Sequence, residues 1–171
     1  EDKTSPFATI ATTAHQYSVV KEVQSLKAVV EQCMGYDTLC FDLETSGFDI
    51  FGCRIVGLSL AVEPHKAWYI PFPNTEDRNE IESLYASILK PLFESETIVK
   101  VGQNMKFDIL FLRTIGIDVK GKKGDTMLMH YLLDPEARHG MNALAERYLE
   151  YSPITIESLI GKGAQQITMD M

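Results

Sequence analysis

The stretch that decides the fold is Leu39-Cys40-Phe41-Asp42-Leu43-Glu44-Thr45-Ser46-Gly47. An apolar run leads into two carboxylates one residue apart, and a small polar turn follows. Because residues i and i+2 of a strand point to the same face, Asp42 and Glu44 are predicted to stand side by side near a strand end. Two like charges held that close resist joint ionisation unless a cation lies between them. Carboxylate oxygens suit Mg²⁺ or Mn²⁺. Taken alone, the motif is equally explained by two solvated acids at a strand end.

The composition is that of one globular domain. The chain has 171 residues, of which 45% are hydrophobic and 23% charged. No apolar run approaches the ~20 residues of a membrane span, and no signal-peptide pattern is present, so we expect a cytoplasmic protein without a membrane partner. Cys33, Cys40 and Cys53 form no Cys-x-x-Cys pair, which predicts reduced, buried thiols. The net charge of −8 argues against a broad basic surface for duplex DNA, but not against nucleic acid at a metal-centred cleft.

The order of predicted elements indicates an α/β fold with a mixed sheet. Residues 1–16 lack periodicity and are interpreted as an N-terminal tail or linker. Short strands are predicted at 17–20, 39–44, 54–62, 67–72 and 98–101, and the short links between the second, third and fourth favour an antiparallel meander. Helical spacing predicts helices at 23–33, from Asn79 as the N-cap to 92, from 104 to 115, and at 126–133, 142–149 and 157–160.

A third acid is predicted at the same edge of the sheet. Asp108 lies four residues after Asn104, in the helix that follows the turn Gly102-Gln103-Asn104. A strand, a tight turn and a helix place such residues at the carboxyl edge of a sheet, where α/β proteins bind ligands. Three converging acids are able to hold a metal pair ~3.5–4 Å apart. The alternative for Asp108 alone is an exposed helix acid beside Lys106.

Two motifs then resemble a known family. Residues 41–46 (Phe-Asp-Leu-Glu-Thr-Ser) and 101–108 (Val-Gly-Gln-Asn-Met-Lys-Phe-Asp) are similar to the first and second motifs of the DEDD superfamily of 3′→5′ exonucleases. The particular form resembles the proofreading domain of the bacterial DNA polymerase I (family A) group, from about residue 17 to 168. The further matches are at 56–59, 69–71, 125–127, 144–147 and 161–163. The resemblance implies a ribonuclease-H-like exonuclease fold, with a central mixed five-stranded sheet flanked by helices.

The resemblance also implies a two-metal site. It makes Asp42 the ligand shared by both ions, Glu44 a ligand of the ion that activates water, and Asp108 a ligand of the second ion. The cofactors would be two divalent ions, Mg²⁺ or Mn²⁺, with Zn²⁺ allowed in the first site.

A second set of residues is assigned to the substrate by the same resemblance. Gln103, Asn104 and Phe107 would lie near the 3′-terminal nucleotide, and Phe48 would be a wedge against the terminal bases. Arg138 matches a basic residue near the substrate phosphate. The full set is Thr45, Phe48, Gln103, Asn104, Phe107 and Arg138. Core packing for the two phenylalanines and a plain surface charge for Arg138 are the alternatives.

One motif of the family is not found in the sequence. The third motif, Tyr-x-x-x-Asp, supplies the fourth carboxylate and a tyrosine that orients the attacking water. His130 and Asp134 do not replace it, because they align elsewhere and the histidine form has a longer spacing; Asp170 has Gln166 four residues before it. We therefore expect residues 17–171 to be an exonuclease domain that lacks this motif, folds only in part and binds metal weakly.

The predicted function is proofreading. The domain would hydrolyse the terminal phosphodiester of a single-stranded or frayed 3′ end of DNA and release 5′-mononucleotides, with a polymerase domain C-terminal to it. Its location would be the bacterial cytoplasm, at the nucleoid. Two alternatives remain: an RNase D-like exoribonuclease, and a non-catalytic module that positions DNA for a polymerase.

Overall fold

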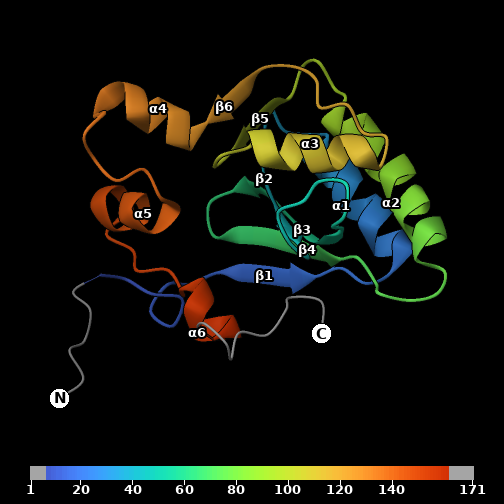
Figure 1. Ribbon diagram of the computed structural model, residues 1–171, viewed down its shortest axis with the longest axis horizontal. Coiled ribbons are helices and arrows are strands. Elements are labelled where there is room, and N and C mark those ends of the chain that lie inside the picture. The colour runs from blue at the N-terminus through green and yellow to red at the C-terminus, as the bar shows by residue number, and fades with distance from the viewer. Residues whose placement is uncertain (1–6, 162–171) are drawn as a thin grey trace.

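The sheet is organised around β2 (Thr38–Thr45), which lies in its interior (Figure 1). The computed structural model describes residues 7–161. β2 pairs antiparallel with β3 (Ile55–Glu63), and β3 pairs antiparallel with β4 (Lys66–Pro71), which confirms the predicted meander. β5 (Val99–Gly102) lies parallel to β2 on its other side.

Two short strands complete the sheet at its edges. β1 (Gln16–Val19) pairs parallel with β4, and β6 (Lys123–Asp125) pairs parallel with β5. The order is β1-β4-β3-β2-β5-β6, so the mixed sheet has six strands rather than the expected five. The additional strand is β6, whose three residues, Lys-Gly-Asp, carry no apolar run that sequence patterns detect.

Six helices surround the sheet in the described part of the chain. They are α1 (Val23–Cys33), α2 (Arg78–Phe93), α3 (Lys106–Thr114), α4 (Thr126–Leu133), α5 (Met141–Leu149) and α6 (Ile156–Ile160). The predicted helices are confirmed, with ends that differ by at most two residues; the N-cap of α2 is Asp77, not Asn79. In Figure 1, α4 and α5 lie on the opposite side of β2 from α1 and α2.

Burial alternates along β2 and separates the core from the acids. Leu39, Phe41 and Leu43 are buried, and the Phe41 ring meets Phe93 of α2 edge-on with centroids 5.1 Å apart. The residues between them, Asp42 among them, point to the other face of the strand. The apolar half of the pattern thus fixes β2 against the helices and leaves the acidic half directed away from the core.

Further observations concern the N-terminal segment, the cysteines and the length of the helices. Ala8, in the predicted tail, forms an isolated parallel bridge with Tyr151. The three cysteines are free, but the prediction that they are buried holds only for Cys33, since Cys40 is exposed and Cys53 is partly exposed. Within residues 7–161, no helix is long and apolar enough to cross a membrane. Predictions that fall on residues 1–6 and 162–171, including those for Gln166 and Asp170, lie outside the described residues.

Candidate active site

Asp42 and Glu44 share one face of β2, as their spacing predicts. The register places Asp42 opposite Ser59 and Glu44 opposite Gly57 on β3. The regular pairing then breaks between Glu44 and Thr45, so the second acid stands at the point where the ladder becomes irregular. Both carboxylates are only partly covered, and solvent or a ligand has access to them.

Asp108 reaches the same strand from α3. Its side chain is 4% exposed, and its Oδ1 accepts a hydrogen bond from the Leu43 N–H at 3.2 Å. The pairing of β2 with β5 ends at Cys40, so the edge of β2 beyond that residue has no strand partner on this side. The Asp108 carboxylate takes the place of a strand carbonyl there. The alternative of an exposed helix acid is therefore wrong.

The three acids influence one another electrostatically. Burial raises the pKa of Asp42. Burial and then the Asp42 charge raise the pKa of Glu44. Burial, followed by the same charge, raises the pKa of Asp108 to about 6, against a smaller opposing effect of the Leu43 N–H. The charge of Asp42 thus acts on both other acids. For each of the three carboxyl groups, the fold disfavours the ionised form relative to the protonated form.

A bound cation would reverse that cost. None of the ion pairs among residues 7–161 includes Asp42, Glu44 or Asp108. Carboxylate oxygens on one face are the donors that hard divalent ions prefer, so the residues fit such an ion in chemistry. In geometry they are less complete, because no group of three acids, histidines or cysteines in the described chain is already arranged to hold an ion.

Asp125 organises the turn that precedes α3, and sequence reasoning gave it no role. Its carboxylate accepts hydrogen bonds from the N–H groups of Asn104 at 3.0 Å and Met105 at 2.9 Å. It also caps α4 by accepting from Met127 and Leu128. Asn104 has a φ of 56°, a left-handed conformation that needs such support. An aspartate directly before a helical pattern is an N-cap signal, and this signal would have predicted the capping role of Asp125 from the sequence.

Gln103 and Arg138 lie at the same margin of the site. The Gln103 Nε2 donates to the His139 carbonyl at 2.7 Å, and its Oε1 accepts from the Thr126 hydroxyl. Gln103 therefore ties the loop before α5 to the turn before α3. Arg138, next to His139, is exposed in that loop.

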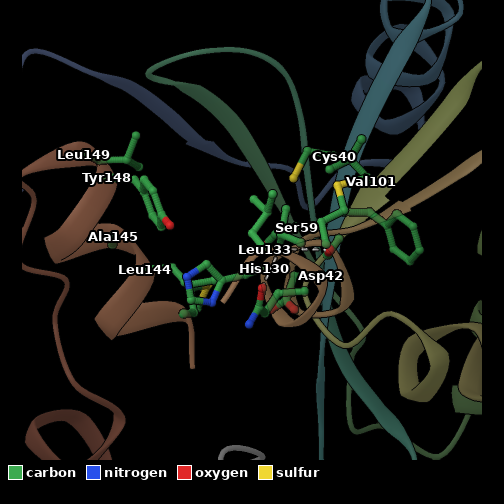
Figure 2. A pocket seen from close by; sticks show the side chains of 16 residues that line it. Cys40, Asp42, Ser59, Val101, His130, Leu133, Leu144, Ala145, Tyr148 and Leu149 are labelled. Atoms are coloured by element: carbon green, nitrogen blue, oxygen red, sulfur yellow. Dashed lines mark hydrogen bonds between the residues drawn. The ribbon is translucent and has the colours of Figure 1, made fainter. Parts of the chain in front are cut away.

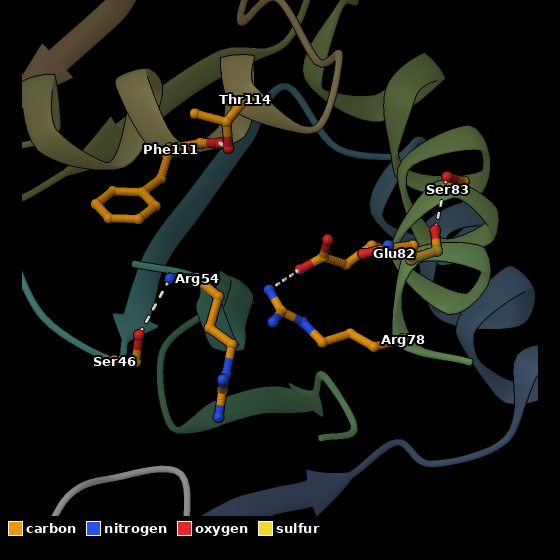
Figure 3. Close-up of polar contacts among 8 residues, drawn as sticks. Ser46, Arg54, Arg78, Glu82, Ser83, Phe111 and Thr114 are labelled. Atoms are coloured by element: carbon orange, nitrogen blue, oxygen red, sulfur yellow. Dashed lines mark hydrogen bonds and ion pairs between the residues drawn. The ribbon is translucent and has the colours of Figure 1, made fainter. Parts of the chain in front are cut away.

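Phe48 and Phe107 form an aromatic pair at the other margin. The Phe48 side chain is 90% exposed, which excludes a core role, and its ring centroid lies 6.1 Å from that of Phe107. Phe107 is partly buried and packs on Phe111 of the core. The loop that presents Phe48 is closed by Ser46, whose Oγ accepts from the Arg54 N–H at 3.1 Å (Figure 3). Thr45 is tied locally, through its hydroxyl, to the Gly47 carbonyl at 2.8 Å.

A cavity of about 710 Å³ opens beside Asp42. The sheet contributes Asp42 and Ser59 to its wall, and Figure 2 shows His130, Leu133 and Tyr148 facing them from α4 and α5. The acidic end of β2 thus borders a hollow large enough for a small ligand.

A family profile covers most of the chain. The profile described as 3′-5′ exonuclease matches residues 17–171. The chain belongs to the 3′-5′ exonuclease family. The prediction of a 3′→5′ exonuclease domain of the DNA polymerase I type is confirmed.

Relatives in sequence agree with this assignment. The chain is 37% identical over 164 residues to DNA polymerase I of Pseudomonas aeruginosa, covering 90% of the chain and 18% of that protein. It is 29% identical over 189 residues to DNA polymerase I of Rhizobium leguminosarum, covering 96% of the chain and again 18% of the relative. The chain therefore spans about 18% of the length of these curated relatives.

Solved structures confirm the ribonuclease-H-like exonuclease fold. NrnC of Brucella melitensis with bound Mg²⁺ matches with a TM-score of 0.61 at 15% identity, over 84% of this chain and 65% of that one. RNase D of Escherichia coli matches with a TM-score of 0.64 at 15% identity, over 85% and 36%. At such identities the likeness concerns the fold alone.

Proposed function

We propose that this exonuclease domain removes nucleotides from a single-stranded or frayed 3′ end of DNA, as the proofreading part of a bacterial DNA polymerase. The observation that carries the proposal is the set of three desolvated carboxylates that meet at Asp42. DNA is chosen as the substrate because the relatives that match 90% and 96% of this chain are both named DNA polymerase I.

The acids would hold two divalent ions, Mg²⁺ or Mn²⁺. Asp42, as the neighbour of both other acids, is suited to contact both ions, Glu44 to contact the first and Asp108 the second. In such sites one ion lowers the pKa of the attacking water and the other stabilises the leaving oxygen. The burial of Asp108 means that it is ionised, and ready to bind a cation, only above about pH 6.

The other assigned residues would hold the DNA end. Phe48 is exposed and backed by Phe107, so it is placed to stack against an unpaired terminal base. Arg138 is exposed and positively charged, so it attracts a phosphate. It lies next to His139, whose carbonyl accepts a hydrogen bond from Gln103. Asn104 lies in the turn before α3, and Thr45 is the last residue of β2, next to Glu44. Single-strand preference follows, because bases must unstack to reach such a cleft.

The remaining parts of the proposal concern the whole protein. A polymerase region C-terminal to this domain would hold the duplex, in keeping with the net charge of −8 on this chain. The bacterial cytoplasm, at the nucleoid, would be the site of action. Because the fourth family carboxylate is not among these residues, we expect metal binding to be weak and cleavage by this chain to be slow.

Cleavage of a 5′-labelled single-stranded DNA oligonucleotide with Mn²⁺ tests the proposal. We expect a ladder that shortens from the 3′ end and is lost in Asp42→Ala. The matched control is Glu136→Gln, which alters an exposed acid in the loop between α4 and α5. Shortening from the 5′ end, or a ladder that survives Asp42→Ala, would contradict it.

An RNase D-like activity is the second candidate, and it is favoured by the fold shared with RNase D. Matched RNA and DNA oligonucleotides in competition distinguish the two. Faster loss of the RNA would replace the first proposal by the second. A non-catalytic module is disfavoured, because such a module has no need to keep Asp42, Glu44 and Asp108 together.

A further inference from the structure

Tyr69 lies on the acidic face of the sheet, two strands from β2. The register places it opposite Ser59 on β3, and Ser59 stands opposite Asp42. Residues directly opposite one another in a sheet point to the same face. Tyr69 therefore projects from β4 on the side that carries Asp42 and Glu44, and its side chain is partly buried there.

The phenol ring of Tyr69 does not lie over Ser59, the residue opposite it, but extends along β3 and covers Gly57. A Cβ atom at Gly57 would stand 2.1 Å from the Tyr69 hydroxyl oxygen, 2.3 Å from Cζ and 2.5 Å from Cε2. Position 57 is left open by the glycine, and the end of the tyrosine side chain fills it. Gly57 is in turn the residue directly opposite Glu44.

The tyrosine hydroxyl is consequently brought to the position that faces Glu44. Side-chain origins of opposite residues lie roughly 4.5–5.5 Å apart, which a glutamate side chain spans easily. Among residues 7–161, the Tyr69 hydroxyl forms no hydrogen bond, and none of the ion pairs there includes Glu44. Burial, and after it the charge of Glu44, raise the pKa of Tyr69, so the phenol remains a protonated donor at neutral pH.

We propose that Tyr69 is a positioning residue of the site, whose unpartnered hydroxyl donates to the Glu44 carboxylate when that side chain turns toward Gly57, and so limits the orientations of Glu44. This inference rests on the proposed function, since it assigns Glu44 to a divalent cation. A flexible glutamate that is held in one orientation loses less entropy when it binds an ion, so affinity should depend on the hydroxyl.

A purely structural role would need only the ring. An aromatic side chain that covers a glycine on a neighbouring strand stabilises a sheet without any polar contact. Tyr69→Phe separates the two roles, because it keeps the ring over Gly57 and removes only the O–H. Tyr17→Phe is the matched control, since Tyr17 lies on β1 on the same face, opposite Ala67.

The experiment has one readout without metal and one with Mn²⁺. At pH 8 without metal, the carboxyl carbon resonance of Glu44, assigned by its loss in Glu44→Gln, should move in Tyr69→Phe and stay fixed in Tyr17→Phe. The Mn²⁺ dissociation constant should rise about 10-fold in Tyr69→Phe, as for other groups that orient a metal ligand. The urea midpoint should not change.

Two outcomes have different meanings. An unchanged Glu44 resonance and unchanged Mn²⁺ affinity in Tyr69→Phe would overturn the inference and leave the proposed function standing. A wild-type chain that neither binds Mn²⁺ nor cleaves DNA would overturn the proposed function and the positioning role with it. Gly57→Ala adds a check, because its Cβ must displace the phenol and should move the Glu44 resonance as Tyr69→Phe does.

Discussion

Replacement of Asp108 by asparagine should stabilise the metal-free protein at high pH. The pKa of Asp108 rises from 3.8 to about 6 in the fold, because burial and the Asp42 charge disfavour its ionised form. Between these two values the folded state keeps a proton that the unfolded state has lost, so the free energy of unfolding falls as the pH rises. At ~1.36 kcal/mol per pKa unit, the full cost is about 3 kcal/mol above pH 6.

Asparagine avoids that cost and keeps the useful contact. Its side-chain oxygen is able to accept the hydrogen bond from the Leu43 N–H, and its neutral amide carries no charge to repel Asp42. Asp108→Asn should therefore gain up to ~3 kcal/mol at pH 8 and little at pH 3.5, where the acid is protonated in the folded state and mostly protonated in the unfolded state. For a chain of this size the gain corresponds to about 6–12 °C in Tm.

Urea unfolding in EDTA at the two pH values measures the effect. Glu136→Gln, at an exposed acid, is the control and should change stability little at either pH. No gain for Asp108→Asn at pH 8, or an equal gain at both pH values, would refute the reasoning, because the burial of an ionised carboxylate would then not be the cause.

Three further predictions concern the remaining parts of the site. Mn²⁺ should raise the Tm of the wild-type chain more at pH 8 than at pH 5, since Asp108 must lose its proton to bind, and the effect should vanish in Asp42→Asn; an equal rise at both pH values would contradict this. Asp125→Ala, which removes the acceptor of several backbone N–H groups, should lower the free energy of unfolding by about 2–4 kcal/mol in urea, and a loss below ~1 kcal/mol would mean that water replaces the carboxylate. Phe48→Ala should leave the free energy of unfolding within ~0.5 kcal/mol, because the ring is exposed, yet raise the KM for single-stranded DNA; an unchanged KM would remove Phe48 from the substrate site.

The sequence predicted those features that depend on a single element. The alternation along 39–44 identified β2 and its two faces, because strand periodicity acts locally. The helix periods located α1 to α6 for the same reason. The antiparallel meander of β2, β3 and β4 was predicted from the short links between these strands.

Features that depend on two distant segments were not accessible in this way. The burial of Asp108 arises because β5 stops pairing with β2 at Cys40 and leaves a backbone N–H for its carboxylate. The role of Asp125 depends on β6 lying beside β5, and the strand is too short to be predicted. The contact of Tyr69 with position 57 joins two neighbouring strands, β4 and β3, and depends on the glycine at that position.

Calorimetric titration of Mn²⁺ into the chain at pH 8 tests the central claim most directly, namely that Asp42, Glu44 and Asp108 form the metal site of this exonuclease. The account predicts weak but measurable binding to the wild-type chain, because the site proposed from the described residues has only these three carboxylates, and no binding to Asp42→Asn. Tight binding of two ions, or binding that persists in Asp42→Asn, would contradict it.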